Sequence, residues 1–330
     1  MESCRRGFVY ETMLRMFWSL NRNRVKTASI AQTIGIPRAL VYHLYPALWE
    51  TFLSEIGKTV VVSVPTSRHT VEQAGLISES EHCLPVKLFD AHLASLAGQV
   101  DAVFVPRILS TLAGHISCPK LGALPDCARA QFSAEFDVLS VDINEARFSL
   151  EASMKELGKM LGADKPLIQQ ATNRALSAMH SAQAVPLPVP RPEGALRFLV
   201  IGHPYNLQDD FLAGPVFQKL DLLEVVAEPV SFVRRIVKPE PVKWDTCSLL
   251  YDQLKNLVPT EWDGVIHLSS FNCGCDSIVS TLYHDILRDK KIPCMTLVLD
   301  EHAGQAGVDT RLEAFVDSIK DQHEHAATRH

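Results

Sequence analysis

Apolar residues along this chain follow two patterns that alternate. Short runs rich in valine, isoleucine and leucine are typical of buried parallel strands. They are separated by stretches in which apolar residues recur every three or four positions, as on one face of a helix. The strand-like runs lie at 29–36, 58–64, 100–106, 196–201, 224–230, 264–268 and 294–299. Strands and helices in alternation predict parallel sheets flanked by helices.

The helical stretches differ in length. The predicted helices lie at 38–56, from Cys83 to about Ala97, and at 206–221, 245–257, 276–289 and 308–320. Residues 5–22 predict an amphipathic leader helix. Residues 142–183 predict a helical connector with a break at Gly162–Pro166.

A proline-rich segment marks the boundary between two domains. Residues 184–194 alternate proline with other residues, which favours extended polyproline II structure over a helix or an interior strand. We therefore expect an α/β fold with two Rossmann- or flavodoxin-like domains, whose parallel sheets are flanked by helices. The expected divisions are an N-terminal helical leader at 1–28, an α/β domain with the helical connector at 29–183, the linker at 184–194, a second α/β domain at 195–320 and a disordered tail at 321–330.

Composition and charge exclude several classes of protein. The chain has 330 residues, of which 47% are hydrophobic and 21% charged, as is typical of a globular protein. A net charge of -6 gives no basic face for nucleic acid. No apolar run approaches the roughly 20 residues that span a bilayer. A signal peptide needs an uninterrupted apolar segment near its start, and here the charged residues Glu11 and Arg15 interrupt that segment. We expect a cytoplasmic protein that binds neither nucleic acid nor membrane.

The eight cysteines are the main candidates for chemistry. Cytoplasmic thiols stay reduced, so metal binding, catalysis or plain burial is more typical of them than a disulfide framework. Cys83, Cys118 and Cys273 lie in short loops. Cys83 and Cys273 also stand where helices are predicted to begin, and a helix N-terminus favours a thiolate. We therefore predict that the three loops converge in a cleft between the domains and hold an iron–sulfur cluster.

Spacing alone leaves other roles open for these cysteines. Three thiolates with His82 would make a tetrahedral zinc site. Cys273 and Cys275 form a Cys-Gly-Cys pair that would suit redox chemistry. A buried free cysteine is most often a small hydrophobic residue, and we favour this interpretation for Cys4, Cys127, Cys247 and Cys294.

Seven separate segments carry a resemblance to a known family. They are Ile34–Leu40, Glu79–Lys87, Val103–Ile108, Cys118–Lys120 with Leu124–Asp126, Gly202–Asn206, Ser270–Asp276, and Asp300–His302 with Arg311–Phe315. In this order they resemble the uncharacterised domain that accompanies acyl-CoA dehydratase activases. That domain is related to the cluster-bearing subunits of 2-hydroxyacyl-CoA dehydratases and to double-cubane-cluster proteins. The resemblance covers most of residues 30–320.

The resemblance implies a cofactor and a partner. It implies that Cys83, Cys118 and Cys273 bind a [4Fe–4S] cluster whose fourth iron is open to water, substrate or another ligand. Cys275 would be an extra ligand or a bystander, and Cys127 falls outside the pattern of the family. The dehydratase relatives pair two such subunits and take an electron from an ATP-hydrolysing activase of the ASKHA type. An activase partner and a homo- or heterodimer are therefore implied here too. The chain has no Gly-x-x-x-x-Gly-Lys-Ser/Thr phosphate loop, so ATP chemistry would belong to the partner.

Several titratable residues lie in loops that are expected to face the cleft. Each could act as an acid or a base, although a helix cap or a solvated charge is the commoner role for such a residue. The candidates are Glu79, Glu81, His82, His203, Glu301 and His302. Arg38, at the start of a predicted helix, could meet an anionic group or form a structural ion pair.

Three functions follow from these observations. The leading hypothesis, from the resemblance, is an iron–sulfur protein of the 2-hydroxyacyl-CoA dehydratase-like group. It would perform low-potential electron transfer or reductive chemistry, as a dehydratase or reductase component that acts with the activase. The second is a noncatalytic accessory domain that docks on the activase. The third is a structural protein stabilised by zinc.

Overall fold

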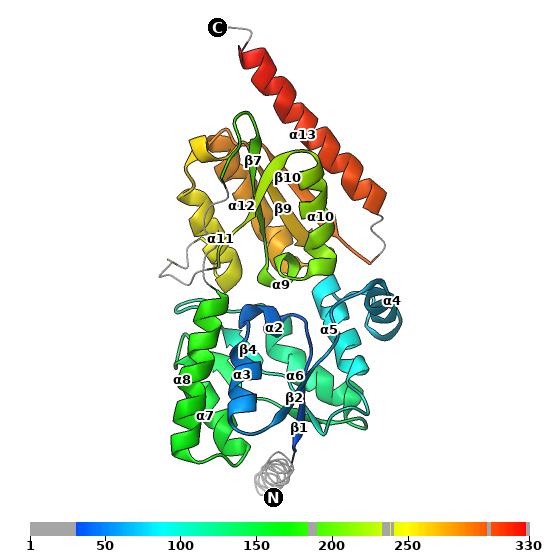
Figure 1. Cartoon of the computed structure of the whole chain (residues 1–330), viewed down its shortest axis with the longest axis vertical. Helices are drawn as coiled ribbons and strands as arrows, with labels where there is room; N and C mark the ends of the chain where they lie inside the picture. Colours follow the sequence, from blue (N-terminus) through cyan, green and yellow to red (C-terminus); the bar gives the residue numbers. More distant parts are fainter. Residues whose placement is uncertain (1–30, 184–189, 233–237, 239–240, 302–304, 328–330) are drawn as a thin grey trace, which may run out of the picture.

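Two four-stranded parallel sheets organise the part of the chain that the computed structural model describes, which is residues 31–183, 190–232, 238, 241–301 and 305–327. The first sheet has the order β2-β1-β3-β5 and the second has the order β10-β9-β7-β8. Helices flank both sheets, and the two halves are stacked end to end along the long axis of the molecule (Figure 1). The predicted two-domain α/β fold is therefore confirmed. The predicted leader at 1–28, Cys4, His302 and residues 184–189 of the linker lie outside the described residues.

The first half contains the first sheet and the helices that pack on it. Its strands are β1 (Thr33–Ile36), β2 (Thr59–Val62), β3 (Ala102–Phe104) and β5 (Asp137–Leu139), while β4 (Arg107–Ser110) and β6 (Asp142–Asn144) pair in a separate parallel ribbon. Its helices are α2 (Val41–Leu44), α3 (Leu48–Glu55), α4 (Arg68–Ile77), α5 (Leu84–Ser95), α6 (Pro119–Phe132), α7 (Leu150–Met160) and α8 (Lys165–Ala182).

The second half is built around two central strands. Its strands are β7 (Leu196–Gly202), β8 (Val225–Pro229), β9 (Gly264–Ser270) and β10 (Cys294–Leu299). Its helices are α9 (Pro204–Leu207), α10 (Asp210–Leu222), α11 (Asp245–Lys255), α12 (Gly274–Asp289) and α13 (Gln305–Ala327), with a short 3-10 helix, η1 (Pro259–Glu261).

Alternate residues of β7 serve two different apolar layers. Phe198 and Val200 belong to a buried cluster with α10 and α13, whereas Leu199 and Ile201 belong to one with α11 and α12. This alternation is what a strand covered on both faces requires. The first of these clusters also includes Leu84 and other residues of α4 and α5, so the helix that begins after Cys83 packs on the second half.

Each of the seven strand-like runs of the sequence contains a strand, because buried parallel strands are continuous apolar segments. The prediction of one helix at 38–56 is wrong. Pro46 has no N–H to donate and Ala47 has a left-handed backbone with φ 61°, so the segment divides into α2 and α3. The connector at 142–183 begins with strand β6 instead of a helix, and its two helices are separated at Gly162, whose φ is 79°.

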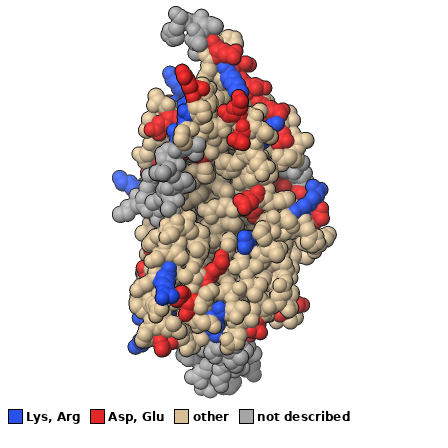
Figure 2. Space-filling model, viewed as in Figure 1, with Lys and Arg blue, Asp and Glu red and all other residues tan. Residues whose placement is uncertain are grey.

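Helix α13 continues through residues 321–327, where the sequence predicts a tail. None of the described helices is both long and apolar enough to cross a membrane. On the face seen in Figure 2, lysine and arginine side chains are scattered among acidic ones without a continuous basic patch.

A chain of hydrogen bonds, buried at His92 and partly buried at Thr66, joins the two halves. His92 lies between Ser63 Oγ, 2.9 Å from Nδ1, and Thr66 Oγ1, 3.1 Å from Nε2. The Thr66 hydroxyl in turn donates to Asp209 Oδ2 at 2.5 Å, and Asp209 caps α10 of the second half. Burial lowers the pKa of His92 to about 4, and the charge of Arg38 and protonation of His43 act in the same direction.

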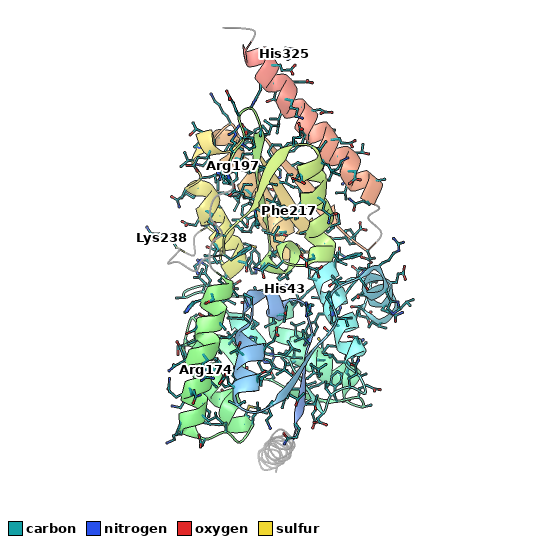
Figure 3. The ribbon with its side chains drawn as sticks, viewed as in Figure 1. His43, Arg174, Arg197, Phe217, Lys238 and His325 are labelled. Carbon is teal, nitrogen blue, oxygen red and sulfur yellow. The ribbon has the colours of Figure 1, made fainter. Side chains whose placement is uncertain are left out.

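His43, in α2, is a second buried histidine near the junction (Figure 3). Burial, followed by the charge of Arg38, lowers its pKa to about 4 as well. Both rings are therefore neutral in the folded protein at physiological pH.

We expect the free energy of unfolding to fall as the pH drops from 6.5 towards 4. Both histidines take up a proton near pH 6.5 in the unfolded chain but only near pH 4 in the folded one. Stability from the neutral rings is therefore fully present above pH 6.5 and is lost through this window, at about 1.4 kcal/mol per pH unit for each ring. Denaturant unfolding between pH 7 and pH 4 measures the slope. The variant His92→Gln should flatten it, whereas His180→Gln, at an exposed position of α8, should not.

Gly202, the last residue of β7, is expected to tolerate no side chain. A Cβ at this position would lie 2.6 Å from the backbone oxygen of Leu268 in β9. Gly202→Ala should therefore lower the free energy of unfolding by about 1–3 kcal/mol, because the central strands would have to separate. The matched control is Gly75→Ala in α4, where nothing lies within 4 Å and alanine should be neutral or stabilise by up to about 1 kcal/mol. Equal urea midpoints for Gly202→Ala and the wild type would contradict this packing.

Candidate metal centre

Each of the three predicted cysteines is the N-cap residue of a helix. Cys83 precedes α5, Cys118 precedes α6 and Cys273 precedes α12. Pro85 and Pro119, in the first turns of α5 and α6, suit a helix start because proline lacks the N–H that would be unpaired there. The other free N–H groups and the positive ends of three helix dipoles therefore lie next to the cysteines.

Cys118 lies in contact with both halves. It packs against the buried cluster of the first half that includes Cys83 and against the buried cluster of the second half that includes Cys273 and Cys275. Cys83 and Cys273 are each 9% exposed. The fold thus brings the three cysteines together at the junction of the halves, with Cys275 beside them.

The thiols of this group affect one another. Burial raises the pKa of Cys83, the Lys120 ammonium lowers it, and Cys273 and Cys118 raise it. The contact with Cys275 raises the pKa of Cys118, and burial raises it further. The raised pKa values keep the Cys83 and Cys118 thiols protonated until a cation replaces the proton.

The remaining cysteines have different surroundings. The contact with Cys118 lowers the pKa of Cys275, but the contact with Cys247 and burial outweigh it and raise that pKa to about 12. Cys247 is buried in α11 and Cys294 is half-buried, whereas Cys127 is exposed on α6. The prediction that Cys127 is a buried hydrophobic residue is wrong, because it lies on the solvent side of its helix.

A buried histidine–carboxylate pair lies beside Cys273. His203 Nε2 is 3.9 Å from Cys273 Sγ and 3.0 Å from Asp276 Oδ1. The second contact is an ion pair without an aligned hydrogen bond, because Oδ1 has no hydrogen-bond donor among the described residues. Asp276 Oδ2 accepts a hydrogen bond from Ser269 Oγ at 3.0 Å and is 3.8 Å from His267 Nε2.

This pair is charged in spite of its burial. Burial opposes the charge of His203, but the Asp276 carboxylate outweighs it and raises the pKa of His203 well above 6.5. Burial likewise opposes the charge of Asp276, but His203 holds the pKa of that carboxyl below its usual value. The ligand atoms of His203, Cys273 and Asp276 lie within 4.8 Å of one another, so this group could hold a metal ion.

Hydrogen bonds to Asp245 fix the position of the Cys118 loop. Asp245, 4% exposed in the first turn of α11, accepts from Thr111 N at 3.0 Å and Thr111 Oγ1 at 2.7 Å. Its Oδ2 also accepts from the hydroxyl of Ser117, the residue before Cys118. Main-chain bonds from Ile116 N to Lys243 O and from Asp245 N to Ile116 O join the same segments. The loop is therefore held by the second half although it belongs to the first.

The predicted acid and base residues are not all at this site. Glu79 and Glu81 are exposed, and His82 is half-buried with its Nδ1 3.0 Å from Ser78 Oγ. The Glu301 carboxylate pairs with the buried Lys87 ammonium at 2.5 Å. Of the candidates that the structure describes, His203 is the one in contact with a cysteine of the group.

Other residues near the site were not assigned by sequence reasoning. Lys120 acts on Cys83, and its position two residues after Cys118, in the first turn of a helix, was a usable signal. The sequence around Asp245 and His267 has no motif that would have placed either residue at this site. Arg38 donates from Nε to the Ser63 carbonyl at 3.2 Å, a structural contact away from the cysteines.

A cavity of about 350 Å³ lies against Cys118. Its lining includes Leu109, Ser117 and Gly122, and Arg107 at its edge is paired with Asp126 at 2.8 Å. Cys118 therefore lies at the wall of a surface cavity.

Comparisons with known proteins identify a family. A family model described as a CoA enzyme activase uncharacterised domain matches residues 33–232. No curated protein matches the chain. Among solved structures, a LacI family transcriptional regulator from Arthrobacter sp. FB24 in complex with lactose is 13% identical, with 87% of this chain and 90% of that chain covered and a TM-score of 0.22. An uncharacterised protein from Bacillus cereus ATCC 10987 is 10% identical, with 85% and 96% covered and a TM-score of 0.24. Neither similarity is close enough to bear on fold or function.

Replacing Asp245 by alanine is expected to free the Cys118 loop. The variant leaves the donors of Thr111 and Ser117 buried without their acceptor, which should lower the free energy of unfolding by about 3 kcal/mol. Cys118 should also react faster with a thiol reagent, as mapped by mass spectrometry. Asp285→Ala, which removes a surface pair with Arg288, should change stability by less than about 0.5 kcal/mol. Unchanged Cys118 reactivity in Asp245→Ala would show that something else holds the loop.

Proposed function

This chain belongs to the CoA enzyme activase uncharacterised domain family, and from that membership we propose that it is a [4Fe–4S] protein that transfers low-potential electrons with an ATP-dependent activase. The observation that carries the proposal is the meeting of Cys83, Cys118 and Cys273 at three helix N-termini between the two halves. The packing of the two halves does not by itself require three thiols from distant segments to lie next to one another, so their proximity favours a shared ligand.

The donor set suits an iron–sulfur cluster. Thiolates are the usual ligands of such clusters, and all three candidates are at least partly buried. His203 Nδ1 is buried without a hydrogen-bond partner among the described residues, as is expected beside a site built to hold another group. Lys120 and the three helix dipoles supply positive charge next to a site that would gather several thiolates.

A [4Fe–4S] cluster, when bound, accepts and passes on single electrons at low potential. The residues of this chain provide its surroundings. Burial of Cys83 and Cys273 excludes water, which together with nearby dipoles sets the potential. The cavity against Cys118 is where we propose that a partner or a small molecule approaches.

The family description connects this domain with a CoA enzyme activase. We propose that the activase is of the ASKHA type, that it hydrolyses the ATP and delivers the electron, and that two cluster-bearing subunits act as a dimer. Reliance on reduced thiols supports a cytoplasmic location. Among the acid and base candidates, His203 is the one we retain near the reacting centre.

A second candidate function is a protein stabilised by zinc. It is favoured by the group of His203, Cys273 and Asp276, whose imidazole, thiol and carboxylate are the donors that zinc uses. A third candidate function is a noncatalytic accessory domain that docks on the activase. Such a domain would have the same cysteines but would transfer no electron.

Metal analysis of cysteine variants tests the proposal. Anaerobically purified wild type should be brown, with about four irons per chain, and reduction should give an S = 1/2 EPR signal. Cys83→Ala, Cys118→Ala and Cys273→Ala should each lose most of the iron and the colour. Cys127→Ala, at an exposed position on the same helix as Lys120, is the matched control and should keep both.

The competing functions give different results. Full iron content in Cys83→Ala would falsify its role as a ligand. A colourless wild type with stoichiometric zinc supports the zinc-stabilised protein. A brown protein that an activase with ATP fails to reduce supports the docking domain.

A further inference from the structure

His203 occupies an unusual position relative to the three cysteines. It is 5% exposed and its Nε2 lies 3.9 Å from Cys273 Sγ. It is also close enough to Cys118 to affect its ionisation, and its ring stacks on Tyr205 with centroids 4.9 Å apart and planes 8° apart. Stacking on Tyr205 therefore fixes the plane of the imidazole ring next to the cysteine thiols.

The hydrogen bonds of this ring are incomplete. Nδ1 is buried and has no partner among the described residues, although buried ring nitrogens are normally bonded. Asp276 lies 3.0 Å from the other nitrogen and is itself fixed by Ser269. A metal-ligating histidine usually directs its other ring nitrogen at a carboxylate, and here Nε2 faces Asp276 while Nδ1 has no partner among the described residues.

Three thiolates leave one iron of a four-iron cluster without a protein ligand. Imidazole is a good ligand for iron and replaces thiolate in some iron–sulfur centres. A neutral imidazole also adds no negative charge to a buried site, whereas a fourth thiolate from Cys275 would. The Cys275 thiol is in addition already in contact with Cys118 and Cys247.

We infer that His203 supplies the fourth ligand of the cluster, through a ring nitrogen. This inference rests on the function proposed above. The bond that forms is between iron and a ring nitrogen, the N–H bond of that nitrogen breaks, its proton passes to solvent, and no electron is transferred in the step. All four irons then have protein ligands, so the cluster carries electrons and has no site left for a substrate.

Pulsed EPR on the full-length, reduced protein tests the inference. The wild type should show the ¹⁴N coupling of a nitrogen bound directly to iron, and ¹⁵N-histidine labelling should convert it to the ¹⁵N pattern. His203→Ala should lose this coupling while it keeps about four irons per chain. His180→Ala, exposed on α8, is the matched control and should keep the coupling.

A second variant keeps the test decisive if His203→Ala fails to assemble. His203→Cys offers a thiolate in place of the imidazole, so it should hold the cluster, lose the nitrogen coupling and lower the midpoint potential. The inference is overturned if the wild type has four irons and an S = 1/2 signal without directly bound nitrogen, or if the coupling persists in His203→Cys. A wild type that assembles no cluster at all overturns the proposed function instead.

Discussion

The buried carboxylate of Asp245 determines where Cys118 lies. It accepts hydrogen bonds from Thr111 and Ser117, so a loop of the first half is held on a helix of the second. A carboxylate with 4% exposure is expensive to bury unless its oxygens are bonded, and here both are, since Thr246 N donates to Oδ1 at 2.8 Å. Together with the main-chain bonds of Ile116, this contact holds Cys118 against the cluster that contains Cys273 and Cys275. The relative position of the two halves and the geometry of the cysteine group therefore depend on each other.

The junction between the halves relies on polar contacts as well as apolar packing. Lys87 with Glu301 and Thr66 with Asp209 add two more, partly buried links. Such pairs contribute little net stability because desolvation offsets their attraction, but breaking one leaves a buried charge unpaired. They favour one arrangement of the halves over others that would bury the same apolar area. The cysteine group is assembled from both halves, so displacement of one half would separate Cys83 from Cys273.

The sequence predicted those features that depend on local patterns. Continuous apolar runs identified seven strands, and a cysteine followed by proline identified the helix start at Cys83. The helix predicted at 276–289 begins two residues earlier, at Gly274, with Cys273 as its N-cap. The break at Pro46 was missed because apolar periodicity continues across it, and β4 and β6 are too short to leave a pattern. Asp245, His267 and the contact of His203 with Cys273 join residues tens of positions apart in the chain. From the sequence, Asp245 is indistinguishable from an ordinary helix residue, His267 from an ordinary strand residue and His203 from an ordinary helix cap.

The surroundings of His203 separate two kinds of iron–sulfur protein. A cluster that binds substrate needs an iron that faces an open space and has no protein donor nearby. At this site the cavity lies against Cys118, whereas the part of the group around Cys273 is closed by His203, Asp276 and His267, all of which are buried. Electron tunnelling through a protein needs proximity but no open coordination position. The cluster proposed above, with His203 as its fourth ligand, would thus be better suited to passing electrons to a partner than to holding a molecule while it reacts.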